Sequence, residues 1–399
     1  MNRVRRLLFL TSAIVFFDTL FFTALTPLLP HYAQALGLGK AGAGVLAAAY
    51  PAGCLFGSIP SGMVAARLGV KPTVLAGLTV VAACTVLFGL ATQAWQLDVA
   101  RFAQGFASAF SWTGALAWLV AGTPVARRGA TIGNAFAAAT GGALFGPVLG
   151  AVASQAGVRW TFVVVGAASL GLAGWAAATP AERPEEAQPL SMLWRAFRHP
   201  HVRLGCWFVV LPALCFGTLG VLSPLRMSAL GLSSVAIGAV FLVAAAGETV
   251  VNLVIGRASD RYGTVLPLRV GLLASAVSAL LLPWPERGIV LAVVVVLAAI
   301  SFGTFFTPGM TMLSHAAESV GLDYGYTFAL VNVAWAPGQA LGAAGSGALA
   351  HATSDTLPYL LLSGVCALTL AALWRASTAS TMPSARASSG PSQPTTAAD

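Results

Sequence analysis

Long apolar stretches separated by short polar segments run through almost the whole chain. Each stretch reaches about 20 mostly apolar residues, the length that an α-helix needs to cross the hydrocarbon core of a bilayer. Because backbone polar groups must find partners inside lipid, such stretches form helices. The pattern predicts an all-α membrane protein with twelve transmembrane helices, at 7–30, 41–65, 72–92, 95–120, 131–154, 158–178, 203–225, 234–256, 265–284, 288–313, 324–350 and 356–374.

The predicted spans divide into two sets of six. We expect a six-helix bundle at 1–178, a cytoplasmic linker at 179–202 and a second bundle at 203–375. Within the linker, Leu193, Trp194 and Phe197 stand beside two arginines, which is typical of a short amphipathic helix on a membrane surface. The tail at 376–399 is rich in Ser, Thr, Ala and Pro, and we expect it to be disordered.

Composition agrees with this pattern. Charged residues make up 8% of the 399 residues, against about 25% in soluble domains. The net charge of +9 is compatible with nucleic-acid binding, but the basic residues are not clustered and instead punctuate the apolar stretches. With the N-terminus inside, sixteen basic residues fall in inner segments and four in outer ones. This inward bias predicts cytoplasmic N- and C-termini, and we expect a bacterial inner membrane.

The two halves of the chain repeat short patterns. Three residues of the segment after the second span recur 194 residues later, and three around the fifth span recur 196 residues later. The first set is Gly62, Arg67 and Gly69, matched by Gly256, Arg261 and Gly263; the second is Gly129, Gly142 and Gly146, matched by Gly325, Gly338 and Gly342. Parallel six-helix repeats about an axis along the membrane normal are the plan of major facilitator transporters.

The loop at 62–71 resembles the GxxxDRxGRK loop of the major facilitator superfamily. The resemblance implies a latch between the two halves, but Ala66 replaces the acid of the motif and Val70 replaces a basic residue. The second copy keeps the acid as Asp260, before Arg261. We therefore expect a weaker or differently built latch in the first half. Both copies are also compatible with simple basic turns that obey the inside rule.

The fourth span contains Arg101, Gln104 and Gly105, which are similar to the RxxQG motif of twelve-helix drug–proton antiporters. The resemblance implies that Arg101 takes part in proton movement. An arginine inside a span costs at least about 2.5 kcal/mol, so it must be paired or reach water. The alternative is that its side chain extends to the nearby outer interface.

The fifth span contains Gly142, Gly146, Pro147 and Gly150, which resemble the GxxxGPxxG motif of the antiporters. In that family the motif accompanies exporters, so the resemblance implies export. The glycines also make a bare stripe for close helix packing, and generic packing is the alternative explanation.

Two carboxyl side chains are predicted deep in the membrane. Asp18 precedes Pro27 and Pro30 in an arrangement similar to the first helix of tetracycline exporters and vesicular monoamine transporters. Glu248 lies within the eighth span. Because burial favours the protonated form of a carboxyl, such a group can exchange a proton for a cation. We hypothesise that Asp18 and Glu248 divide proton carriage and cargo recognition while Arg101 adjusts their proton affinity; a hydrogen-bonded structural acid is the alternative.

Asn332, Trp335 and Gln339 share one face of the eleventh span and are expected to line a substrate cavity, although interhelical hydrogen bonds explain them equally well. No metal-ligand template or phosphate-binding GxxxxGK[ST] loop is found in the sequence. We therefore expect neither an enzyme nor a cofactor.

The sequence favours a monomeric secondary transporter that exports small organic molecules by proton antiport with alternating access, as multidrug resistance pumps do. Its expected partners are a small-molecule substrate, protons and the lipid bilayer, without nucleic acid. An uptake symporter for a sugar or amino acid is the alternative on the same fold. A membrane receptor or scaffold is a third possibility, which the short loops disfavour.

Overall fold

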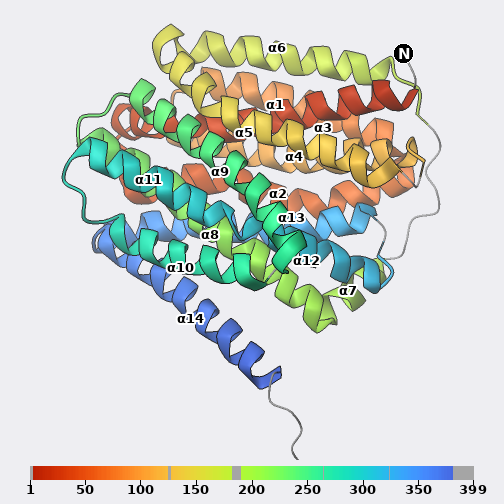
Figure 1. Ribbon diagram of the computed structural model, residues 1–399. Helices are drawn as coiled ribbons and strands as arrows, with labels where there is room; N and C mark the ends of the chain where they lie inside the picture. Colours follow the sequence, from red (N-terminus) through yellow and green to blue (C-terminus); the bar gives the residue numbers. More distant parts are fainter. Residues whose placement is uncertain (1–2, 125–126, 182–189, 264, 323, 381–399) are drawn as a thin grey trace, which may run out of the picture.

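The computed structural model describes residues 3–124, 127–181, 190–263, 265–322 and 324–380. Helices make up nearly all of these residues (Figure 1). They are α1 (Arg3–Ala35), α2 (Lys40–Leu68), α3 (Val70–Leu90), α4 (Ala94–Ala121), α5 (Arg128–Ala156), α6 (Val158–Ala177), α7 (Leu190–Arg198), α8 (Pro200–Ala229), α9 (Ser234–Tyr262), α10 (Val265–Leu281), α11 (Gly288–Gly303), α12 (Phe306–Ser319), α13 (Tyr324–Ala352) and α14 (Thr356–Ser380).

Nine helical stretches of the described chain are long and apolar enough to cross a membrane, with α11 and α12 counted as one stretch. Helix α10 is apolar but shorter, whereas α4 and α13 have the length but contain more polar residues. These two helices are interior, because α4 packs against α2 and α3, and α13 packs against α2 and α8. Shielded from lipid, they tolerate polar residues. The fold therefore contains the twelve predicted spanning helices.

The helices differ from the predicted spans most clearly in two places. The span predicted at 288–313 is divided into α11 and α12, with Thr304 and Phe305 between them. Pro308 explains the break, because a proline has no N–H to donate to the carbonyl four residues earlier. Helix α14 also continues to Ser380, beyond the predicted boundary at 375. The remainder of the predicted tail lies outside the described residues, as does the middle of the predicted linker.

The helix-packing contacts repeat between the two halves. In each half, two glycines let a central helix approach the first helix of that half: Gly142 and Gly146 of α5, and Gly338 and Gly342 of α13. A Cβ atom at these positions would lie 2.3, 2.8, 2.4 and 2.3 Å from the carbonyl oxygens of Phe16, Leu20, Val210 and Leu214, respectively. The partner positions are 194 residues apart (210 − 16 and 214 − 20). The structure thus confirms two six-helix repeats.

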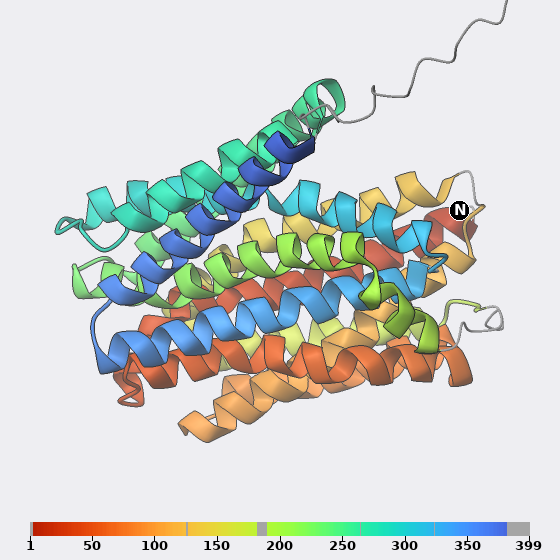
Figure 2. The ribbon, with the colours of Figure 1, turned by 90° about the horizontal axis from the view of Figure 1, so that it is seen from below.

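The two ends of the bundle are closed to different extents. We name the end that carries Arg3 and Ser380 the terminal end and the opposite end the far end (Figure 2). At the far end, Gly44 of α2 packs against Ala343 and Gly347 of α13, with a Cβ-to-oxygen distance of 2.7 Å at Ala343. This contact joins the two halves tightly.

A second far-end contact mirrors the first, between Gly238 of α9 and Pro147 and Ala151 of α5. Gly238 follows Gly44 by 194 residues (238 − 44). Between the two contacts, the Gln34 amide lies 3.4 Å from the Ser228 hydroxyl, and these residues are also 194 apart (228 − 34). Equivalent positions touch each other only on a symmetry axis, so this bond marks the pseudo-two-fold axis.

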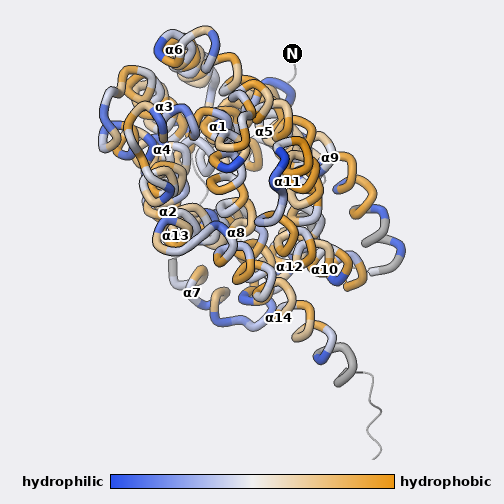
Figure 3. Tube along the Cα trace, turned by 90° about the vertical axis from the view of Figure 1, so that its left-hand side faces the viewer, coloured by the Kyte–Doolittle hydropathy of each residue, from blue (hydrophilic) through white to orange (hydrophobic). Residues whose placement is uncertain are grey.

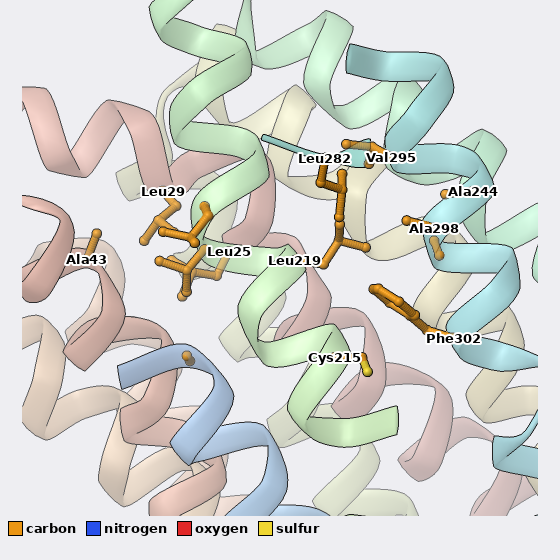
Figure 4. Close-up of a cluster of buried hydrophobic side chains, with 14 of the residues drawn as sticks. Leu25, Leu29, Ala43, Cys215, Leu219, Ala244, Leu282, Val295, Ala298 and Phe302 are labelled. Carbon is orange, nitrogen blue, oxygen red and sulfur yellow. The ribbon is translucent and has the colours of Figure 1, made fainter. Parts of the chain in front are cut away.

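A large apolar cluster fills the region between these contacts. It includes Leu25 and Leu29 of α1, Leu219 of α8 and Phe302 of α11 (Figure 4). At the terminal end, the described ring contact between the halves is the pair Phe136 and Phe328, with centroids 5.7 Å apart. There α14 runs obliquely away from the bundle (Figures 1 and 2). The far end is therefore sealed by packed helices, whereas at the terminal end α14 diverges from the bundle.

Hydropathy agrees with a membrane-embedded bundle. The outward-facing turns are largely hydrophobic, and hydrophilic residues gather at the helix ends (Figure 3). Helix α7 differs from the spans, because it exposes Trp194 and Phe197 beside Arg198, whose guanidinium lies 5.8 Å from the Trp194 ring. An aromatic and basic surface of this kind suits the membrane interface.

Candidate functional site

Asp18 lies at the centre of a hydrogen-bonded cluster between α1, α2 and α4. Its side chain is 6% exposed. The Tyr50 hydroxyl, the Ser108 hydroxyl and the Trp112 indole N–H all reach its Oδ2 atom, at 2.8, 2.8 and 2.6 Å. Ser108 and Trp112 stand four residues apart on α4, so one helix face supplies two of the three donors.

The cluster has room for one more proton. The Tyr50 and Ser108 hydroxyls are also 2.8 Å apart, so these two oxygens and Asp18 Oδ2 form a triangle with three close contacts. Each hydroxyl carries one proton, and an ionised carboxylate carries none. Two protons therefore serve three contacts when Asp18 is charged, and a protonated carboxyl supplies the third. The geometry can thus accommodate both states of Asp18.

Arg101 points into the protein interior and is 2% exposed. Its guanidinium donates to the carbonyl oxygens of Phe21 and Phe22 at 3.2 and 3.3 Å, and to Gln104 Oε1 at 2.9 Å. It also lies 4.8 Å from the centre of the Tyr50 ring. The side chain does not extend to the outer interface. Instead, Tyr50 connects the cation to Asp18, with its ring against Arg101 and its hydroxyl against the carboxyl.

The other residues of the α4 motif hold this arrangement in place. Gln104 donates to the Thr85 hydroxyl at 2.8 Å, which fixes the amide oxygen toward Arg101. Gly105 lies directly against the backbone of Tyr50, where any Cβ would overlap the carbonyl oxygen. Gly105 therefore sets the position of the residue that links Arg101 to Asp18.

The glycine stripe of α5 lies along the helix that carries Asp18. Gly142 and Gly146 contact the backbone at Phe16 and Leu20, on both sides of Asp18, and Gly150 contacts Ala24. The carbonyl of Pro147 faces Gly238 of the second half. The motif thus fixes α1 against α5 and also contributes to the far-end contact between halves.

The second half reaches this site through Trp335. The Trp335 ring packs edge-on against Phe22, with centroids 5.4 Å apart, and Phe22 lies 5.1 Å from the Tyr50 ring. Asn332 and Gln339 are partly buried on the same helix. Of the three residues predicted to line a cavity, Trp335 is the one whose described contacts join it to the Asp18 cluster.

Glu248 lies on a different contact, between α9 and α11. A Cβ added to Gly303 would come within 2.4 to 2.6 Å of its side chain, so the carboxyl rests on the end of α11. The Asn252 side chain hydrogen-bonds it from one turn along α9. Its described contacts do not reach the Asp18 cluster. The hypothesis that both acids share one central cavity therefore gains no support from these contacts.

The glycines of the two loop motifs form the turns that follow α2 and α9. Gly69 follows the last residue of α2 and has a φ of 98°. Its N–H donates to the carbonyl oxygen of Ala65 at 3.1 Å. Gly263 has φ of 80° at the corresponding turn. Arg67 is exposed, and the Cβ position of Gly62 is open. The surroundings of Gly256 and the side chain of Asp260 lie outside what the structure describes, so the latch of the second copy stays a prediction.

Sequence reasoning missed Phe22, Tyr50, Ser108 and Trp112. A usable signal was present on α4, where Arg101, Gln104, Ser108 and Trp112 recur every three or four residues on one face. A polar stripe on a spanning helix marks the side that faces other helices. Within the described residues, no group of three or more His, Cys, Asp or Glu side chains could hold a metal ion.

Comparison with known proteins finds a matching family model and relatives at 25% and 27% sequence identity. The family model of the Major Facilitator Superfamily matches residues 11–336 and 213–397. An MFS-type transporter, ppzB, from Metarhizium majus is 27% identical over 302 residues, covering 61% of this chain and 66% of the fungal protein. The human synaptic vesicular amine transporter is 25% identical over 317 residues, covering 75% of this chain and 59% of that protein. The matches thus span less than two thirds of these relatives' lengths.

Solved structures share the fold at lower identity. The nucleoside transporter NupG superposes with a TM-score of 0.71 at 16% identity, covering 94% of this chain and 99% of NupG. A bacterial homolog of the human lysosomal transporter Spinster, in an inward-facing and unoccupied conformation, superposes with a TM-score of 0.69 at 17% identity, covering 95% of this chain and 96% of the homolog.

Proposed function

Since the chain belongs to the Major Facilitator Superfamily and is a multi-pass membrane transporter, we propose that it exports small organic cations in exchange for protons. The observation that carries the proposal is the Asp18 cluster, where three donors meet one buried carboxyl oxygen. An ionisable group buried in a membrane protein is costly, so the presence of Asp18 there supports a functional role.

Proton and cargo compete for Asp18 in this scheme. With the carboxyl ionised, a cationic group of the cargo binds it, and Trp335 and Phe22 provide aromatic faces that attract cations. With the carboxyl protonated, the attraction is lost and the cargo leaves. The Arg101 cation offsets part of the negative charge of the site, because it lies against Tyr50, the residue that donates to Asp18.

Alternating access requires the two halves to rock about the central site. The closed far end supports a conformation that opens toward the terminal side. The bias of basic residues supports a cytoplasmic terminal end, and we propose that the membrane is a bacterial cell membrane. We propose that Asp18 receives cargo from that side and that the protein works as a monomer, since each chain contains both halves of the site.

Glu248 has a separate role in this proposal. Its contact with Gly303 supports a packing role within the second bundle, beside the break between α11 and α12, rather than a cargo-binding role. An uptake symporter is the second candidate, favoured by Ala66 at the acid position of the first-half loop. The α5 glycine stripe, which the resemblance associates with exporters, weighs against it.

Proteoliposomes test the proposal. Purified protein is reconstituted, a proton gradient is imposed across the bilayer, and a fluorescent organic cation is followed. An antiporter moves the cation opposite to the protons, and Asp18→Asn loses this response while still folding. Movement in the same direction as the protons supports the symporter. Gradient-driven movement that survives in Asp18→Asn excludes Asp18 as the coupling group.

A further inference from the structure

An open groove lies on the outer surface of the second half, between α10 and α14. In the first third of α14, the Ser363 hydroxyl joins the two helices by donating to the Ala276 carbonyl at 2.7 Å. Toward the terminal end the two helices border a groove with a volume of about 430 Å³. Its walls include Leu273, Ala367, Leu370 and Ala371. The groove is therefore apolar along most of its length.

The mouth of the groove carries positive charge. Trp374 and Arg375 line it at the end of α14. The Arg269 guanidinium of α10 lies 4.9 Å from the Trp374 ring, so a second cation stands at the same place. From Ala367 to Arg375 the groove follows eight residues of helix, about 12 Å at 1.5 Å per residue. The apolar groove thus leads from the membrane interior to two arginines beside an exposed tryptophan.

These features match the chemistry of a phospholipid. Tryptophan and arginine are common at the membrane interface, and basic pockets between transmembrane helices bind anionic headgroups. We propose that the groove binds one anionic phospholipid, with an acyl chain along Leu273 and Ala367 and the phosphate at Arg269 and Arg375.

Charge decides between this occupant and the others. A second copy of the chain seated on the groove would bring the same two arginines against each other, which like charges oppose. A zwitterionic lipid offers the same acyl chain but a neutral headgroup, so the arginines would gain little. The anionic lipid satisfies the apolar walls and the positive mouth together.

Native mass spectrometry of the full chain tests this site. The purified protein is mixed with phosphatidylglycerol or phosphatidylcholine of identical acyl chains, and bound lipid is counted. We expect one phosphatidylglycerol to be retained more tightly than phosphatidylcholine. The variant Arg269→Gln/Arg375→Gln should lose about 30-fold in affinity, or about 2 kcal/mol at about 1 kcal/mol per basic residue.

Three further variants separate the groove from general surface charge. Arg195→Gln/Arg198→Gln removes equal charge from α7 and should leave the tight phosphatidylglycerol in place. Ala367→Phe fills the groove and should lose it, whereas Ala372→Phe, on an exposed face of α14 outside the lining, should not. Equal retention of the two lipids, equal losses in both arginine pairs, or dimers that displace the lipid would overturn the proposal.

Discussion

The two buried carboxyl groups of this protein have different surroundings. Asp18 accepts hydrogen bonds from side chains of two other helices, α2 and α4. Glu248 is bonded by Asn252 of its own helix and rests on the bare backbone at Gly303. The repeat makes the contrast sharper, since the first-half position that corresponds to Glu248 is Cys54 (248 − 194).

This contrast shows how a duplicated fold divides its tasks. In the first half the acid lies on α1, where Phe22 and Trp335 bring the second half against the same site. In the second half the acid lies on α9, inside the contact with α11. A charge at the meeting point of the halves can sense both of them, whereas a charge inside one half affects the shape of that half. We therefore expect Asp18 to control coupling and Glu248 to control local packing.

Substitution of Asp18 is the most direct test of the difference between the two acids. Replacing Asp18 with Asn keeps the size and the hydrogen-bond acceptor but removes the charge, so the exchange of protons for cargo should stop. Cargo binding should weaken about 10- to 100-fold, the worth of a hydrogen bond to a charged group. Initial rates and equilibrium binding in proteoliposomes measure this. Glu248→Gln is the matched control and should keep gradient-driven transport within about threefold; an equal loss there would remove the distinction between the two acids.

The packing role of Glu248 predicts a loss of stability in Gly303→Ala. The new methyl group would overlap the Glu248 side chain, and overpacking of this kind costs about 1–3 kcal/mol. A thermal melt in detergent measures the loss. Adding Glu248→Ala should restore most of the stability, because the space is then free. Gly364→Ala, at an open position on α14, serves as the control and should be neutral. Failure of the double variant to recover would show that Glu248 is not the obstacle.

Tyr50→Phe tests the link between Arg101 and Asp18. The change removes the hydroxyl that donates to Asp18 but leaves the ring against Arg101. Losing one such bond, about 1–1.5 kcal/mol, should slow gradient-driven transport about 5- to 12-fold. Tyr32→Phe is the control, because the buried Tyr32 hydroxyl has no hydrogen-bond partner among the described residues. Equal effects in both variants would mean that the hydroxyl of Tyr50 has no special role.

The smallest effect is expected at Asn252. Its amide bonds Glu248, but its carbonyl oxygen is buried with no partner in the described part of the chain. Asn252→Ala loses the bond and also removes the unsatisfied oxygen, so the two effects offset each other to below about 1 kcal/mol. Melting temperature and transport rate should both stay close to those of the original protein. A large loss of transport in Asn252→Ala would instead give the second acid a part in coupling.

The sequence predicted the helices and the repeat well, because lipid imposes strict limits on composition. Apolar length alone located the spans, and the glycine offsets anticipated the contacts at Gly142 and Gly338. The break at Thr304 could not be located from apolar length, because Pro308 lies within a continuous apolar stretch. The partners of Asp18 were missed for another reason: which faces of α2 and α4 meet α1 depends on tertiary packing. Glu248 shows the limit of depth as a guide, since depth does not tell which neighbour a side chain faces.

An ion pair joins the two halves at the far end, and it makes the two sides of the membrane respond differently to dissolved salt. Lys40 and Asp355 join the halves at 2.6 Å, beside the contact of Gly44 with α13. At the mirrored contact the corresponding residues are Ser234 (40 + 194) and Arg159 (355 − 196), which cannot form such a pair. We expect the contact between α5 and α9, which has no such ion pair, to separate before the contact between α2 and α13. Salt dissolved on the far-end side of the bilayer weakens the ion pair between Lys40 and Asp355 and so changes how often the halves separate there. Salt on the opposite side does not.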